Sequence, residues 1–477
     1  MEKDRKIEIV FWLIFFAIFF HSFCFGWINS IPTIKSDGWR YINIFLKPWL
    51  EGDWNWALLW KDHHPQPITA LLFILNAELF GLRMNYETIF SMFFLFLTSL
   101  LLYKHYIISI VINDYYYIFK FLFLFIILIL FSLKSIQPYI WSLVSLYWIG
   151  NFFGLLLIVF FNKSFEGNIS SNRIVFLFFY TITFLIAFTD QAELFLFSLI
   201  VSIVMLNGNI LLKKNIFLLL ALLVSLIIEK YFFDFVCVKK TFNISTFIDS
   251  ILTSPENIKS YITFAIVGVN SSLIPCNEIL NKVKNVYSIM SIHILVFLIF
   301  LYGIFYSIKN KDRKNIMIPL SFIIFSLFTA VASAIFRFDP SVQSSFSGEI
   351  PRYYQFYSLG GIGAVWILIF RLEDYISKKD MLASKFNKFS LLAISIIFCF
   401  IAFSQLIYSV DSWKKTPYIK KIVEKTNLII MKNASGDLSE KIPRSMVGSN
   451  YPEPYLSDLK LLKKHKLNIF RDENERK

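Results

Sequence analysis

The stretch SDGWRYINIFLKPWLEGDWNWALLWKDHHPQPITALLFILNAELFGLR occupies residues 36–83, between two strongly apolar segments. It combines aspartates, a histidine pair and five tryptophans: Asp37, Asp53, Asp62, His63, His64, Trp39, Trp49, Trp54, Trp56 and Trp60. Tryptophan favours the membrane–water interface, where its ring is buried and its N–H stays hydrated. The stretch therefore predicts an amphipathic segment on a bilayer surface, with carboxylates just outside the hydrocarbon.

The composition of the whole chain excludes an ordinary soluble domain. Hydrophobic residues make up 56% of the 477 residues and charged residues 17%, whereas about a quarter of a soluble domain is charged. Runs such as 121–130 and 216–228 contain no charge. Only helices and closed barrels satisfy the backbone in lipid, and the runs lack the alternation of a barrel strand. The sequence therefore predicts an all-α polytopic membrane protein.

Apolar segments divide the chain into about eleven transmembrane helices. The first, from residue 7 to about 31, is expected to be an uncleaved signal anchor, and the second covers 86–106. The others are expected at 115–133, 140–161, 173–189, 194–211, 215–233, 287–308, 316–336, 355–371 and 389–410. The segment 67–81 is too short to span, so the first extracytoplasmic loop is expected to contain interfacial helices.

The distribution of basic residues predicts the orientation. The chain begins MEKDRK, and every second loop is basic, with Lys163, Arg173, Lys213, Lys214, Lys309, Lys311, Arg313, Lys314, Arg371, Lys378, Lys379, Lys385 and Lys388. Loops 134–139 and 189–193 between them hold only Lys134. By the positive-inside rule the amino terminus is cytoplasmic, and an odd number of spans places the carboxyl terminus in the periplasm of a bacterial inner membrane. The net charge of +14 then reflects inner loops and attraction to membrane lipid, and no nucleic-acid partner is expected.

Three regions follow from this pattern. Residues 1–106 form an amino-terminal module, in which the loop 32–83 joins two spans. Residues 107–410 form a multi-span body with outer loops 234–285 and 337–354, and residues 411–477 form a polar extracytoplasmic tail. Cys237 and Cys276 share the first of these outer loops, which leaves a disulfide between them open.

The order of motifs in the first 105 residues resembles the amino-terminal module of the C-type (GT-C) membrane glycosyltransferases, which use polyprenyl-phosphate sugars. In the lipid A aminoarabinose and protein mannosyl transferases, an acid follows the first span. A Gly-Asp-Trp-like stretch, a Pro-Pro-Leu-like turn, a helix ending in Phe-Gly, and Arg-Leu-Pro come next. The matching residues are Asp37, Gly52-Asp53-Trp54, His64-Pro65-Gln66-Pro67, Phe80-Gly81 and Arg83.

This chain departs from the family pattern at three places. The family's Asp-Glu pair reads Asp37-Gly38, Gln66 splits the proline pair, and Arg83 is followed by Met84 and Asn85. Size and a polar tail look most like the serotype-converting O-antigen glucosyltransferases. The resemblance implies inverting transfer of a monosaccharide from a polyprenyl-phosphate donor to a lipid-linked or surface glycan, such as the O-antigen of lipopolysaccharide, without a metal or other cofactor.

The residues present suit that chemistry. Transfer requires a general base for the acceptor hydroxyl, and Asp37 is the first candidate, with Asp62 the second. It also requires cations near the leaving phosphate. The candidates are Arg337 and Arg352 with Tyr353 in the late outer loop, and Arg40 and Arg83 near Asp37. Interfacial snorkelling is the alternative role of Arg352.

The histidine pair His63 and His64 is expected to hydrogen-bond a sugar or to lie at the interface. A cation site formed with Asp62 is the alternative, but adjacent histidines point to different sides of a helix or strand. Asp190 and Glu193, at the outer end of a predicted span, are interpreted as solvated acids, with a functional role as the alternative.

Two other functions remain open from the sequence: a flippase or transporter for a lipid-linked saccharide, and a surface polysaccharide polymerase or ligase. Transporters often contain internal repeats and helices broken at mid-membrane, and neither is evident in the sequence. A polymerase or ligase is expected to carry a large late outer loop, for which the loop 234–285 is suitable. For the polar tail, acceptor binding is one hypothesis.

Overall fold

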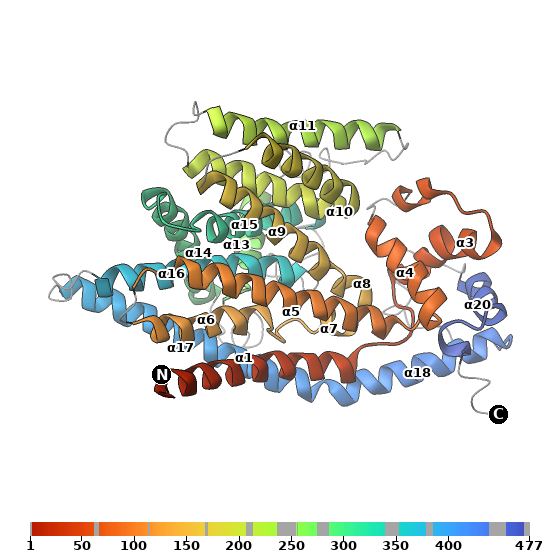
Figure 1. Ribbon diagram of the computed structural model, residues 1–477. Helices are drawn as coiled ribbons and strands as arrows, with labels where there is room; N and C mark the ends of the chain where they lie inside the picture. The colour runs from red at the N-terminus through yellow and green to blue at the C-terminus, as the bar shows by residue number, and fades with distance from the viewer. Residues whose placement is uncertain are drawn as a thin grey trace.

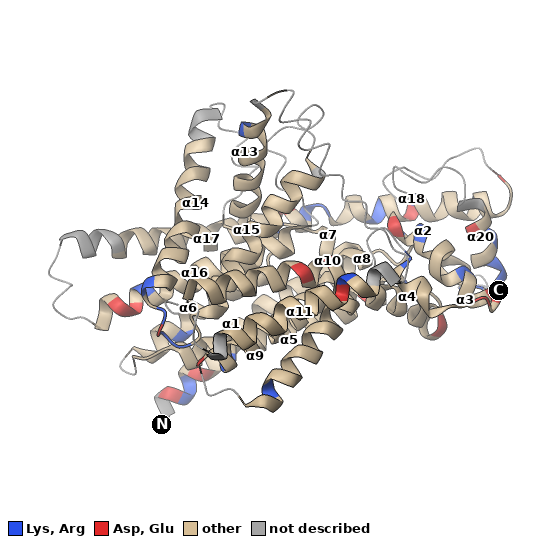
Figure 2. Ribbon diagram, turned by 90° about the horizontal axis from the view of Figure 1, so that it is seen from above, with Lys and Arg blue, Asp and Glu red and all other residues tan. Residues whose placement is uncertain are grey.

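The computed structural model describes residues 2–61, 66–112, 115–166, 170–206, 213–235, 254, 256–273, 286–338, 353–377, 385–437 and 455–471. Within these ranges every regular element is a helix, which confirms the all-α prediction. The long helices lie side by side in a bundle, and a group of short helices sits at one end of it (Figure 1). Charged residues gather mostly toward the two ends, and the middle of the bundle is largely uncharged (Figure 2).

The long helices account for the membrane-spanning character of the chain. They are α1 (Glu2–Asn29), α5 (Met84–Ser109), α9 (Tyr147–Glu166), α10 (Ser171–Leu206), α11 (Lys213–Phe235), α14 (Val286–Lys309), α15 (Met317–Arg337), α16 (Tyr354–Ser377) and α17 (Lys385–Lys414). Among the described residues, eight helical stretches are long and apolar enough to cross a membrane. Burial is greatest along α16, which lies in the core, and α1 has a large exposed apolar face. The fold is therefore that of a multi-pass helical membrane protein.

The longest helix, α10, reverses direction in its middle. Thr189 departs from helical geometry, with φ 41° and ψ −115°. The rings of Phe184 and Phe195 lie 6.0 Å apart, although a straight helix would separate their Cα atoms by about 16 Å. The neighbouring α9 contacts both halves, with Phe160 against Tyr180 and Gly154 against Phe195. The two halves coincide with the separate spans predicted at 173–189 and 194–211.

The chain between α6 (Tyr116–Leu130) and α9 is broken inside the bundle. The short helices α7 (Gln137–Ile140) and α8 (Ser142–Ser145) follow an irregular segment. Carbonyls of that segment accept hydrogen bonds from side chains: Ser22 Oγ donates to Phe131 O at 2.5 Å and Ser412 Oγ to Leu133 O at 2.8 Å. Irregular backbone is tolerated at membrane depth where protein buries it. The predicted outer loop 134–139 is thus largely an internal element.

The described part of the outer loop 234–285 contains a further helix, α13 (Glu256–Asn270). Its Tyr261 and Phe264 pack against Ala334 and Phe338 at the end of α15. Farther along, Val267 is fully buried. This helix therefore inserts an apolar face between α14, α15 and α16.

The first loop and the tail meet at one end of the bundle. The loop contains α2 (Asp37–Tyr41), η1 (Ile42–Leu46), α3 (Lys47–Glu51), η2 (Trp56–Trp60) and α4 (Pro67–Phe80). α17 leads through a turn at Lys415 into α18 (Thr416–Ala434), which reaches the same end. There α20 (Tyr455–Lys464) and η7 (Asn468–Phe470) lie beside the first loop (Figure 1). We call this group, residues 32–83 with 455–471, the end module.

Candidate functional site

The first loop begins with a helical stretch that carries Asp37 at its start. Ser36 turns the chain with a positive φ of 51°, and Gly38 N and Trp39 N donate to the carbonyls of Lys35 and Ser36 at 3.1 Å. The side chain of Asp37 is exposed, whereas Trp39 behind it is 1% exposed. A carboxylate in the first turn is also favoured by the helix dipole. The buried aromatic anchor therefore fixes α2 and leaves the carboxylate of Asp37 open.

The residues flanking Asp37 contact the short helices α7 and α8. A Cβ added to Gly38 would lie 2.9 Å from Ile34 and 4.0 Å from Leu143 of α8. The ammonium of Lys35 lies 5.1 Å from the ring centroid of Trp141, at the junction of the two short helices. The first loop thus rests directly on the interrupted part of the bundle.

Lys35 is a cation that was not among the residues predicted from the sequence. It is half-buried, and this burial lowers the pKa of its ammonium. Within the described part of the chain, the one interaction of its ammonium is the cation–π contact with Trp141. A half-buried ammonium without a carboxylate is costly, so Lys35 is suited to meet an anion. The sequence could have indicated this cation, because Lys35 stands two positions before Asp37.

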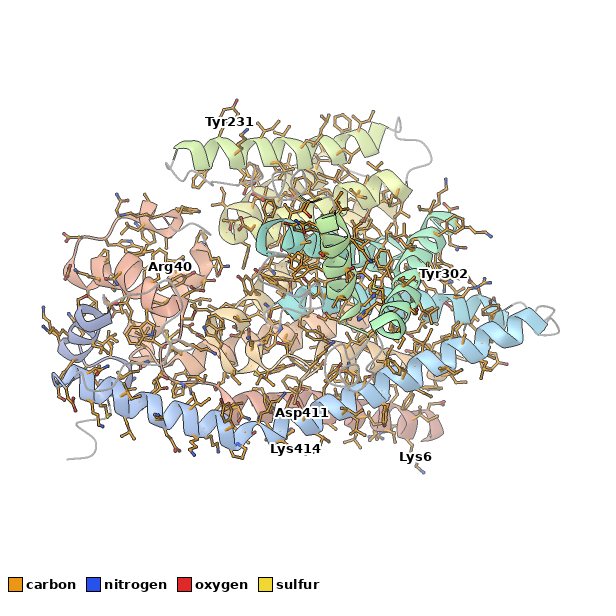
Figure 3. All side chains as sticks on the ribbon, turned by 180° about the vertical axis from the view of Figure 1, so that it is seen from behind. Lys6, Arg40, Tyr231, Tyr302, Asp411 and Lys414 are labelled. Carbon is orange, nitrogen blue, oxygen red and sulfur yellow. The ribbon has the colours of Figure 1, made fainter. Side chains whose placement is uncertain are left out.

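Arg40 follows Asp37 on the same helix, one turn later, where residues at this spacing share a face. It is half-buried and lies within the end module (Figure 3). Arg83 is also half-buried and precedes α5, and its carbonyl accepts a hydrogen bond from Asn76 Nδ2 at 3.2 Å. Both predicted arginines therefore belong to the loop that carries Asp37.

The loop closes through a buried pair at the start of α5. Asn76 Nδ2 donates to Glu87 Oε1 at 2.8 Å, and Leu82 N donates to Asn76 O at 3.0 Å. Gly81 and Leu82 both have φ 62°, a conformation that glycine adopts freely and leucine rarely. Glu87 is 4% exposed. This acid was also not predicted, and it fixes the geometry of the Phe-Gly turn.

The carboxyl-terminal segment holds the same turn from the other side. Asn468 N donates to Gly81 O at 2.7 Å, and Asn468 Nδ2 donates to Leu82 O at 2.6 Å and to Pro32 O at 3.0 Å. In α20, Asp458 accepts a hydrogen bond from Asn43 Nδ2 at 2.9 Å. The tail therefore contacts the exit of α1, the helix after Asp37 and the turn before α5.

Tryptophans cover the outer part of the end module. Trp49 Nε1 donates to Glu78 Oε1 at 2.6 Å, which joins α3 to α4. The Trp54 ring packs edge-on against Trp49 and Trp56, with centroid distances of 5.5 and 5.9 Å. Trp56 is 63% exposed. This surface has the amphipathic character that the sequence predicts for a segment at a bilayer interface.

A seam of amide side chains runs through the bundle, and one of its hydrogen bonds reaches the end module. Gln66 Nε2 donates to the Tyr147 hydroxyl at 2.9 Å, and Gln191 Nε2 donates to Asn151 Oδ1 at 2.7 Å. Gln355 Nε2 donates to Val144 O in the break, at 3.2 Å. Asp190 and Glu193 flank Gln191 and are half-buried, so they are less solvated than expected from their place at a span end.

A small cavity lies beside this seam, with a volume of about 10 Å³. Its lining includes Ser132, Ser135, Asn151, Tyr354 and Gln355. A space of this size with several polar neighbours accommodates about one water molecule. The cavity is therefore large enough for a water molecule beside the polar interior of the break and too small for a sugar.

Several predicted residues lie outside the described residues: Asp62, His63, His64 and Arg352. The side chain of Arg337 is likewise not described, and its backbone ends α15. Tyr353 precedes α16, and its ring stacks on Phe356 at 6.2 Å. Within the described ranges, no group of three or more His, Cys, Asp or Glu side chains could hold a metal ion. Asp37, Arg40 and Arg83 are therefore the predicted charged residues whose side chains the structure describes, and all three lie in the first loop.

No protein-family model matches the chain, and neither a curated protein nor a solved structure is significantly similar to it.

Proposed function

We propose that the chain is a C-type membrane glycosyltransferase that transfers a monosaccharide, with inversion, from a polyprenyl-phosphate donor to a lipid-linked or surface glycan. The observation that carries this proposal is the exposed carboxylate of Asp37 on an otherwise buried helix, next to the half-buried cation Lys35. The order of span, acid, short helices, Phe-Gly turn and span supports the family resemblance. In the structure these elements are the long helix α1, the short helices α2 and α4, and the long helix α5.

In this mechanism Asp37 accepts the proton of the acceptor hydroxyl as the acceptor oxygen bonds to the anomeric carbon. The bond from that carbon to the phosphate oxygen breaks, and polyprenyl phosphate leaves. Positive charge near the phosphate stabilises the negative charge that develops there. Lys35 and Arg40 are the described cations closest to Asp37 in the chain, and both follow α1 at the outer end. Arg83, Arg337, Arg352 and Tyr353 remain further proposed donor contacts, with His63 and His64 at the sugar and Asp62 as the alternative base.

The proposed topology has eleven crossings, with the amino terminus in the cytoplasm and the tail in the periplasm of a bacterial inner membrane. The two halves of α10 count as two crossings, and α6 with the break, together with α11, supplies two more. An odd number agrees with the positions of α1, which begins at one end of the bundle, and α20, which lies at the other (Figure 1). In this arrangement the end module faces outward.

The test is transfer by the purified full-length protein in detergent, supplied with a panel of polyprenyl-phosphate sugars and a membrane glycan extract. We expect the wild type to transfer one sugar and Asp37→Asn to lose about 10²- to 10⁴-fold in rate, the usual contribution of a general base. Glu51→Gln is the matched control, because Glu51 is exposed at the end of the same helical stretch. Equal transfer by Asp37→Asn and the control would reject Asp37 as the base.

A lipid-linked saccharide flippase is the second candidate, favoured by the broken chain between α6 and α9 and by the reversal in α10. Discontinuous helices of this kind form substrate sites in transporters. Binding of lipid-linked saccharide without transfer in detergent, together with its movement across reconstituted vesicles, would favour this function. Chain extension or ligation of an assembled glycan in the same assay would instead indicate a polymerase or ligase.

A further inference from the structure

The outer face of α18 carries a row of basic side chains. Exposed residues recur there every three or four positions, and we call them the basic stripe: Lys421, Lys425, Leu428 and Lys432. Residues at this spacing lie on one face of a helix. Another face of α18 is apolar and buried in the core of the protein, with Ile419, Ile429 and Ile430. The helix is therefore fixed by its apolar face and presents the lysines to the surroundings.

The fold does not neutralise these lysines. Lys421 and Lys425 form no ion pair or hydrogen bond with any residue that the structure describes. Glu424, the one acid in the sequence of α18, is exposed, and helix geometry places it about a quarter of a turn to the side of the stripe. Over residues 414–437 and 455–471, eleven Lys and Arg residues accompany three Asp and Glu residues. This surface is therefore strongly positive.

Most of the basic stripe lies farther out than the end of α1. The Trp413 ring packs edge-on against Phe25, with centroids 5.3 Å apart, four residues before α1 ends at Asn29. From there α18 continues past α1 to α20 (Figure 1 and Figure 2). At a rise of about 1.5 Å per residue, Lys425 lies about 12 Å and Lys432 about 22 Å beyond the end of α1. A headgroup layer is about 5–8 Å thick, so lipid headgroups reach only the inner end of the stripe.

We propose that the basic stripe binds an anionic glycan, a saccharide chain that carries carboxylate or phosphate groups. Its ammonium groups extend over about 16 Å from Lys421 to Lys432, which complements a chain with repeated negative charge better than one small anion. Leu428 lies among the lysines and is 62% exposed, so it offers an apolar surface to the C–H groups of a sugar.

The stripe is connected to the end module through α20. α18 packs against α20, and Asp458 of α20 accepts a hydrogen bond from Asn43 at 2.9 Å, in the element that follows α2. A glycan on the stripe is thus held beside the loop that carries Asp37. We assign this glycan as the acceptor, an assignment that rests on the proposed function, whereas binding of the glycan does not.

Fluorescence anisotropy tests the binding directly, with labelled alginate oligosaccharides as the anionic probe and labelled neutral dextran oligosaccharides for comparison. The full-length protein is held in phosphatidylcholine nanodiscs. We expect it to bind alginate and not dextran. The double variant Lys421→Gln with Lys425→Gln should bind alginate about tenfold more weakly, because two exposed ion pairs are lost. The matched control is Lys309→Gln with Lys311→Gln, which removes the same charge from exposed positions at the other end of the bundle.

Three outcomes would overturn the proposal. One is equal weakening by the two double variants, because net charge alone would then explain binding. Another is equal affinity of the wild type for alginate and dextran. The third is displacement of alginate by soluble short-chain phosphatidylglycerol at the same concentration of charge, which would assign the stripe to lipid headgroups.

The assignment as acceptor has a separate test in the transfer assay. The stripe variant should raise the KM for the glycan extract and leave kcat unchanged, since the stripe lies outside the loop that carries Asp37. An unchanged KM in an active enzyme would overturn this assignment. Absence of transfer by the wild type would instead reject the proposed function, and the alginate measurement would still decide whether the stripe binds an anionic glycan.

Discussion

Charged residues at the two ends of the bundle differ in whether they form ion pairs. At the end remote from the end module, Arg313 forms ion pairs with Glu373 and with Asp374, the latter at 2.8 Å. Glu373 also accepts hydrogen bonds from the backbone N–H groups of Val111 and Ile112, at 2.5 and 2.9 Å. In the end module, Asp37 is exposed and Lys35 has only an aromatic contact. Arg313, Glu373 and Asp374 are thus paired within the fold, whereas Asp37 and Lys35 form no ion pair among the described residues.

Removal of Arg313 should have the largest effect on stability. Its side chain is 11% exposed and that of Glu373 is 3% exposed, so Arg313→Met leaves two neighbouring carboxylates without their counterion. Breaking a buried pair in this way costs about 3–5 kcal/mol. Thermal unfolding in detergent measures the loss. Lys311→Met, at an exposed neighbouring position, is the control and should change stability by less than about 0.5 kcal/mol. A small effect of Arg313→Met would mean that this end is not held by paired charge.

Loss of the Asn468 side chain should loosen the end module without unfolding the bundle. Asn468→Ala removes two hydrogen bonds and leaves the carbonyls of Leu82 and Pro32 without this donor, at a cost of about 2 kcal/mol. Hydrogen exchange should become faster in peptides covering residues 36–46 and 76–84. Lys460→Ala, on the exposed face of α20, should leave exchange unchanged. Unaltered exchange in Asn468→Ala would show that the hydrogen bonds of Asn468 do not stabilise the end module.

Replacement of Lys35 separates a ligand-binding cation from a structural one. If Lys35 meets the donor phosphate, Lys35→Gln should raise the donor KM about tenfold, the value of one charge-assisted hydrogen bond of about 1.4 kcal/mol. The melting temperature should stay the same or rise, because a half-buried charge is removed. Lys61→Gln is the control at an exposed position of the same loop. A normal KM together with a lowered melting temperature would show that Lys35 stabilises the fold and does not bind the donor phosphate.

Docking of the tail should depend on pH through Asp458. Burial raises the pKa of this carboxyl to about 6, and the hydrogen bond from Asn43 and the charge of Lys47 oppose that shift. The docked state therefore binds a proton between about pH 4 and 6 that the undocked state has lost. Docking should be strongest below pH 4, weaken as the pH rises through 6, and then stay constant. Exchange rates of the 455–471 peptides measure this dependence, and Asp458→Asn should abolish it.

The sequence predicted the membrane class and many of the span positions because long apolar runs require burial in lipid. The reversal of α10 could also be predicted from the sequence, because Asp190 and Glu193 interrupt an otherwise apolar run. The broken segment after α6 was not, because its serines and Pro138 are typical of a loop. Docking of Asn468 on the turn at Leu82 joins positions 386 residues apart, and a contact of that kind leaves no periodic pattern in the sequence.

The site was predictable only in part for a similar reason. A carboxylate after the first span is visible in the sequence, and Asp37 occupies an exposed position in the loop that contains Arg40 and Arg83. The importance of Lys35 depends on Trp141, which is distant in the chain and reaches it through the break in the bundle. Glu87 and Asn76 pair across the turn between α4 and α5, and their types alone gave no indication of this contact.

Asp37→Asn and Arg313→Met, measured side by side for sugar transfer and for thermal unfolding, test the central claim most directly. The account predicts that Asp37→Asn melts with the wild type and loses transfer, and that Arg313→Met melts at a lower temperature but transfers below it. Transfer at the wild-type rate by Asp37→Asn, or a fall in its melting temperature as large as that of Arg313→Met, would contradict the assignment of Asp37 as the base.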